Sequence, residues 1–153
     1  MLSQTAEYAL RVVLYVAAHD AEGPVKLDEV ATDLRAPRNS LSKTMHLLAR
    51  AGVLASARGP HGGFNLARPA DRLTLAAVVA PFETVGRGRV CLLGRARCSD
   101  DSPCAAHTRW KGVSEQVSAF FHETTVADLL RGDAAARGAA VAAANGTAGA
   151  RAR

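Results

Sequence analysis

Apolar residues recur at helical spacing through the first third of the chain. Between residues 5 and 19 they form one stripe, which predicts an amphipathic helix. The pair Gly23-Pro24 interrupts this pattern, and a second stripe runs from residue 27 to residue 34. A third predicted helix covers residues 39–51 and stops at Gly52, because glycine commonly follows the last turn of a helix.

The pattern then changes from helical to strand-like spacing. Residues 53–58 and 64–67 predict two strands, and the Gly-Pro-His-Gly-Gly segment at 59–63 predicts the tip of a β-hairpin. A short fourth helix is expected after Thr74, which is a suitable N-cap residue. Two short helices, a tight turn and a Gly-tipped hairpin are together the parts of a winged helix-turn-helix.

A long helix is predicted in the second half of the chain. Ser102 as N-cap and Pro103 at the first helical position mark its start, and it is expected to reach Glu123. Its apolar residues form a heptad seam with spacings of 4, 3, 4 and 3: Ala106, Trp110, Val113, Val117 and Phe120. Because a winged helix of this size already has a core, we expect this seam to pair with a second copy of the chain. The alternative is that the stripe packs on its own domain.

The predicted protein is mainly α and has four parts. These are a winged helix-turn-helix DNA-binding domain over 1–83, a loop over 84–103 that carries two of the three cysteines, a dimerisation helix with a short terminal turn over 104–131, and a disordered Ala/Gly/Arg tail over 132–153. No apolar run approaches the length of a membrane span, and the N-terminal apolar stretch is a poor signal peptide. We therefore expect a cytoplasmic protein.

Positive charge is concentrated in one segment of the body. The formal net charge is +5 at pH 7, and residues 34–70 carry six basic side chains and no acidic one. Such a footprint is typical of a protein that enters a DNA groove. The third helix could present an ordinary solvated surface and the glycines a flexible turn, but the lack of acidic residues favours DNA contact. The expected contact residues are Arg38, Asn39, Ser40, Ser42, Lys43, His46, Arg50, Arg58, Gly59, His61, Gly62 and Gly63.

Three cysteines follow with the spacing Cys91-x6-Cys98-x5-Cys104, and His107 comes shortly after. In a cytoplasmic protein, clustered cysteines indicate metal or redox chemistry rather than disulfides. We expect Cys104 in the first turn of the long helix, where the helix dipole favours a thiolate, with His107 on the same helix face. His107 is then either a fourth ligand or a histidine that caps or packs on the helix. The residue types permit an iron–sulfur cluster, a zinc site, a metal-free thiol switch or unrelated structural cysteines.

Several of these features resemble one family, the winged-helix regulators that include IscR, NsrR and RirA. The resemblance covers about residues 1–130 and rests on Glu7-Tyr8-Ala9-Leu10-Arg11, on Gly59 to Phe64 in the hairpin, on the three cysteines, and on Cys104-Ala105-Ala106-His107 running into Trp110. It implies a homodimer that binds a partly palindromic operator in double-stranded DNA. The x6 spacing is one residue longer than in many IscR-like members.

The resemblance also implies a cofactor. This is an iron–sulfur cluster on Cys91, Cys98 and Cys104, with 2Fe–2S preferred over 4Fe–4S. The fourth ligand in the family is a histidine at the position of His107, or an acidic residue in the first helix of the partner subunit, a place that Glu7 occupies here.

The expected function is that of a transcriptional regulator, a repressor, that senses iron–sulfur, nitric oxide or redox status. No paired catalytic carboxylates, phosphate loop or nucleophile with its base is recognisable, so no enzymatic activity, small-molecule substrate or membrane partner is expected. The alternative is a zinc- or thiol-based redox protein that lacks the cluster.

Overall fold

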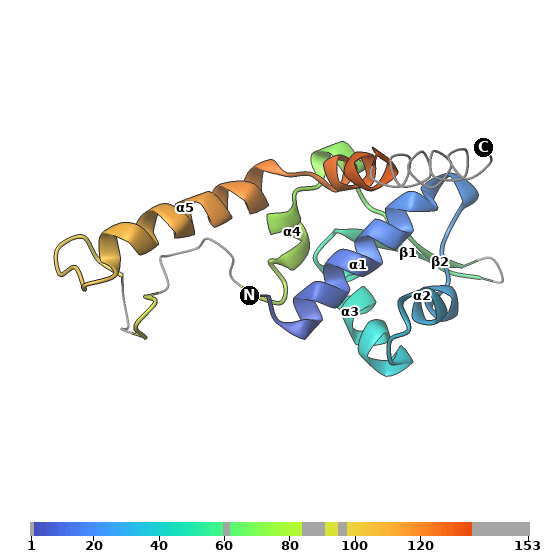
Figure 1. Ribbon diagram of the computed structural model, residues 1–153. Helices are drawn as coiled ribbons and strands as arrows, with labels where there is room; N and C mark the ends of the chain where they lie inside the picture. Colours follow the sequence, from blue (N-terminus) through green and yellow to red (C-terminus); the bar gives the residue numbers. More distant parts are fainter. Residues whose placement is uncertain (1, 60–61, 84–90, 95–97, 136–153) are drawn as a thin grey trace, which may run out of the picture.

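The computed structural model describes residues 2–59, 62–83, 91–94 and 98–135. The helices surround or extend from one small sheet, which is made of β1 (Leu54–Ala57) and β2 (Gly63–Leu66). They are α1 (Gln4–Ala18), α2 (Leu27–Leu34), α3 (Arg38–Arg50), α4 (Leu75–Val79) and α5 (His107–Glu123). Two short 3₁₀ turns, η1 (Asp20–Glu22) and η2 (Ala70–Arg72), complete the order. The expected winged helix-turn-helix is confirmed (Figure 1).

The core lies between α1, α3 and α4. The apolar stripe of α1 is fully buried, and so is one face of α3. Aliphatic rather than aromatic side chains fill this space, as the composition predicts. The central members are Val12, Val13, Val16, Val30, Leu41, Met45, Leu48, Leu54, Leu73, Val78 and Val126.

The turn between α2 and α3 is tightly held. Arg35 ends α2 in the left-handed conformation, with φ of 48°, and its N–H donates to the carbonyls of the preceding turn. That conformation costs a residue other than glycine about 1–2 kcal/mol. Arg11 of α1 offsets part of this cost, because its Nη2 donates to the Leu34 carbonyl at 3.0 Å. The end of α2, where the chain turns into α3, is therefore held by a contact from α1.

The wing contains one more pairing than the sequence predicted. β1 and β2 are antiparallel, with Leu54 opposite Leu66 and Ala57 opposite Gly63. Val25, just before α2, pairs with Phe64, and each N–H donates to the other's carbonyl at 2.9 Å. A single bridging residue has no alternating pattern, so sequence reasoning could not find it. This bridge fixes the hairpin to the start of the helix-turn-helix.

The start of α5 differs from the prediction. Ser102 is not the N-cap and Pro103 is not the first helical residue, because α5 begins at His107. Cys104 therefore lies in the turn before the helix, where its carbonyl accepts from the His107 N–H at 2.9 Å. The expectation that Cys104 sits in the first helical turn, sharing a face with His107, is wrong. The loop before α5 folds back toward the helix, and its residues Cys98 and Asp100 contact the His107 ring.

The end of α5 returns to the winged domain. The Thr124 carbonyl accepts from Leu75 N–H at 3.0 Å, Val126 N–H donates to the Leu73 carbonyl at 2.9 Å, and Thr74 pairs with Thr125. Along the rest of its length α5 projects away from the domain (Figure 1).

A helical segment from residue 126 to residue 135 follows, longer than the short turn expected. Its start is a capping box, in which Thr125 N–H donates to Asp128 Oδ2 at 2.8 Å and Asp128 N–H donates to Thr125 Oγ1 at 3.2 Å. The hydrogen bonds from Thr125 lower the pKa of Asp128, so this stabilisation is present at neutral pH and is lost on acidification. The helix thus covers the first four residues of the expected tail, and residues 136–153 lie outside the described part. No described helix is long and apolar enough to span a membrane.

Candidate nucleic-acid interface and cysteine site

Helix α3 separates its residues by face as the sequence indicated. Leu41, Thr44, Met45 and Leu48 are buried against the rest of the domain. The other face carries the predicted contact residues, of which Ser42 is half-buried and the others are exposed: Arg38, Asn39, Ser40, Ser42, Lys43, His46 and Arg50. A cationic and hydrogen-bonding surface of this kind can meet phosphates and base edges.

Two of these residues also have partners within the protein. Arg38 Nε donates to Asp28 Oδ1 at 2.5 Å, an exposed ion pair that joins α3 to α2. The His46 ring lies edge-on to Phe64, with centroids 5.7 Å apart, and its Nδ1 lies 2.7 Å from the Ser42 carbonyl. In the neutral ring Nδ1 therefore carries the proton and Nε2 is a hydrogen-bond acceptor. His46 links α3 to the wing.

The glycines of the wing have a packing role. The Gly62 N–H donates to the Gly59 carbonyl at 2.9 Å and so closes the turn internally. A Cβ on Gly63 would lie 2.6 Å from the Val25 carbonyl oxygen, which is backbone. Gly59 instead needs its φ of +105°, and no atom lies near the position of its missing Cβ. Arg58 and Gly59 are exposed, whereas His61 lies outside the described residues.

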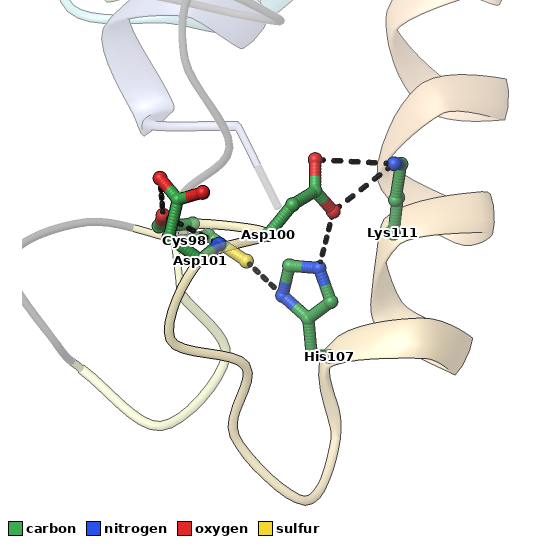
Figure 2. A network of polar contacts seen from close by, with 6 residues as sticks. Cys98, Asp100, Asp101, His107 and Lys111 are labelled. Atoms are coloured by element: carbon green, nitrogen blue, oxygen red, sulfur yellow. Dashed lines mark hydrogen bonds and ion pairs between the residues drawn. The ribbon is translucent and has the colours of Figure 1, made fainter.

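A polar network joins the cysteine loop to the start of α5 (Figure 2). His107 is 5% exposed and is the one buried residue in α5, every residue of which the structure describes. Its Nδ1 lies 3.3 Å from Cys98 Sγ, and its Nε2 lies 2.8 Å from Asp100 Oδ1. Lys111, one turn further along α5, donates to both oxygens of Asp100 at 3.1 and 3.3 Å.

The remaining candidate ligands differ in how far they are buried. Cys91 is buried at 5% exposure, Cys104 is half-buried, and no described cysteine is in a disulfide. Glu7 is exposed in the first turn of α1. Four arginines that lie close to Cys91 and Cys98 in the sequence are outside the described residues: Arg87, Arg89, Arg95 and Arg97.

The donor set fits an iron–sulfur cluster, since thiolates and an imidazole are known iron ligands in such centres. Cys98 and His107 already meet at a protected position. Within the described part of the chain, however, no three Cys, His, Asp or Glu side chains come close enough together to hold a metal ion. The remaining thiols would have to approach the Cys98–His107 pair when a cluster binds.

Sequence reasoning missed Asp100 and Lys111. Asp100 falls within the loop expected over 84–103, and a carboxylate near a candidate histidine ligand is the usual partner of its second nitrogen. The spacing of Lys111 four residues after His107 places both on one face of a helix and was a usable signal.

An exposed apolar face runs along α5. Val113, Val117 and Phe120 are each about half exposed, at 49%, 48% and 51%. Ala106 and Trp110, the other members of the predicted seam, are half-buried. The described chain therefore does not bury this stripe in its own core, contrary to the alternative considered from the sequence.

Comparison with known proteins agrees with this architecture. Residues 2–132 match the Rrf2 family, described as iron-dependent transcriptional regulators. A putative HTH-type transcriptional regulator of Aquifex aeolicus is 36% identical over 85% of this chain and 91% of its own length. The HTH-type transcriptional regulator IscR of Serratia proteamaculans is 31% identical over 84% of this chain and 78% of its own.

A similar fold is found in the structure of CymR, the global cysteine regulator of B. subtilis. It covers 86% of this chain and 96% of that one, with a TM-score of 0.73 and 23% identity. Fold and surface define a winged-helix DNA-binding regulator of transcription. The chain belongs to the Rrf2 family of iron-dependent transcriptional regulators.

The packing role of Gly63 can be tested by adding one methyl group. Gly63→Ala should lower the free energy of unfolding by about 1–3 kcal/mol, because the new Cβ would collide with the Val25 backbone. Urea denaturation measures this change. Gly112→Ala is the matched control: no atom lies within 4 Å of its Cβ position on α5, so alanine should stabilise by about 0.5–1 kcal/mol. Equal effects at both sites would show that Gly63 is not a packing constraint.

Proposed function

We propose that this regulator binds operator DNA as a homodimer through α3 and the wing, and that a cluster held by Cys91, Cys98, Cys104 and His107 controls this binding. The observation that carries the proposal is that one domain presents both an exposed cationic helix face and a cysteine loop in contact with a projecting helix. The cationic face of α3 is exposed on one side of the domain, and the cysteine loop contacts α5, which projects from it.

The proposed DNA contact follows from the shape and charge of the domain. A recognition helix lies in the major groove in helix-turn-helix proteins, and α3 has no acidic side chain that would repel phosphates. The hairpin carrying Arg58 is attached to the same domain through the Val25–Phe64 bridge and the His46–Phe64 contact. Helix and wing would therefore approach the duplex as one unit, with Arg58 near a phosphate or the minor groove.

The proposed dimer follows from the exposed face of α5. A stripe that includes Val113, Val117 and Phe120 lowers the free energy when a second copy covers it, because apolar area is removed from water. Pairing of two such helices gives a two-fold axis, which matches a partly palindromic operator.

The proposed sensing rests on the family and on the donor set. The sequence similarity to IscR and the description of the family as iron-dependent both favour iron chemistry at the cysteines. A bound cluster would supply a group that responds to iron supply, oxidants and nitric oxide. Three thiolates and the His107 ring would hold it and tie the loop to the start of α5. A zinc site or a metal-free thiol switch would use the same residues with a different spectrum.

Operator binding should depend on individual cationic residues of the interface. Lys43→Ala and Arg58→Ala should each weaken binding by about 1–2 kcal/mol, and a phosphate contact should reduce the slope of affinity against salt by about one. Fluorescence anisotropy on duplexes selected from random DNA measures both quantities. Arg109→Ala removes the same charge from the exposed surface of α5 and should leave affinity unchanged. Wild-type affinity and salt slope in the Lys43/Arg58 double variant would contradict the interface.

Dimerisation should fail when a charge enters the apolar stripe. Val117→Glu should raise the dimer dissociation constant by about 100-fold or more, because an unpaired carboxylate buried in an apolar interface costs about 3–5 kcal/mol. Light scattering over a concentration series measures the mass. His122→Glu, which adds the same charge to another face of α5, should remain dimeric. A wild-type protein with the mass of one chain at micromolar concentration would rule the dimer out.

Cluster binding should require all three cysteines. Replacing Cys91, Cys98 or Cys104 by Ala should abolish the visible absorption and the iron and sulfide content of protein purified without oxygen. His107→Ala should alter the cluster's stability if His107 is the fourth ligand, whereas Glu7→Ala should do so if the ligand comes from the partner. Holo and apo protein should differ in operator affinity by about 1–3 kcal/mol. Bound zinc, or a colourless wild type, would favour the zinc or thiol alternative.

A further inference from the structure

The two nitrogens of the His107 ring contact groups of different chemistry, a carboxylate and a thiol. Asp100 Oδ1 lies 2.8 Å from Nε2, and Cys98 Sγ lies 3.3 Å from Nδ1. The ring itself is buried, with 7% of its side chain exposed, so water has little access to either nitrogen. Asp100 is half exposed, but Lys111 Nζ contacts both of its oxygens and holds it in place.

The contact with Asp100 selects one tautomer of the neutral ring. A carboxylate can only accept a hydrogen bond, so the proton must be on Nε2 for this contact to be favourable. The lone pair is then on Nδ1, where it faces the Cys98 sulfur. The opposite tautomer would place the Nε2 lone pair against a negative oxygen in a site where water cannot replace the lost hydrogen bond.

We propose that Asp100, held by Lys111, is a positioning residue that fixes Nδ1 as the nitrogen that His107 presents to the cluster. The proposal rests on the proposed function, since it supposes that the cysteine site holds a cluster. It adds which histidine atom is the ligand and which carboxylate selects it. Carboxylate partners of this kind orient a ligand histidine and raise its basicity as a donor. Figure 2 shows Asp100 between His107 and Lys111 in this arrangement.

The first test uses the full chain without a cluster, labelled with ¹⁵N at histidine, at a pH where the ring is neutral. Long-range proton–nitrogen correlation spectra report the tautomer, and His107→Ala identifies the His107 signals. The wild type should show the Nε2–H form. Asp100→Ala should give a mixture of tautomers, and Asp100→Asn should restore the Nε2–H form because its amide oxygen can accept the same bond. Asp101→Ala, which removes the next carboxylate, should behave as wild type, because Asp101 contacts Ser99 instead.

The second test uses the reconstituted cluster. Loss of iron to a chelator should be about 10-fold faster or more in Asp100→Ala, and the midpoint potential should move upward because the histidine donor is less basic. Asp101→Ala should leave both unchanged. A single Nε2–H tautomer in Asp100→Ala, or equal cluster loss in Asp100→Ala and Asp101→Ala, would overturn the proposal. If the wild type takes up no cluster, the proposed function fails, and the tautomer spectra still decide whether Asp100 orients His107.

Discussion

The contact between α1 and α3 determines which side chains of α3 are exposed on the surface of the domain. The valines of α1 and the buried face of α3 form one continuous core, and this core leaves α3 a single rotation about its axis. Because side chains three and four residues apart share a face, burying Leu41, Met45 and Leu48 necessarily exposes Lys43, His46 and Arg50. The polar surface is thus a geometric consequence of apolar packing behind it.

Elements with a strong local signal were predictable from the sequence, and elements that depend on a distant partner were not. The bounds of α1, α2 and α3 agree with the apolar periodicity to within one residue, and Thr74 caps α4 as expected through its bond to Ala77 N–H. The strands were also found, apart from the Val25 bridge. The capping box formed by Thr125 and Asp128 was a readable signal for the last helix, but it was overlooked.

The start of α5 shows why local rules can fail. Ser102-Pro103 is a good helix start by composition, yet the helix begins four residues after Pro103, at His107. Burial of the His107 ring against Cys98 and Asp100 requires the loop to fold back, and this tertiary contact overrides the capping preference. For the same reason the spacing of the cysteines did not show which of them lies beside His107, because that contact depends on how the loop folds.

The two ends of α5 are attached in different ways, and this makes the helix a lever. Its C-terminal end is bonded to its own domain through the Thr74–Thr125 bridge and the flanking hydrogen bonds, whereas its N-terminal end meets the cysteine loop. A helix of 17 residues is about 25 Å long and bends little over that distance. A tilt of about 5° at one end therefore displaces the other by about 2 Å. A local rearrangement of the cysteine loop would reach Leu73 and Thr74, next to α4, as the motion of a rigid rod, with no need for a chain of altered contacts through the core.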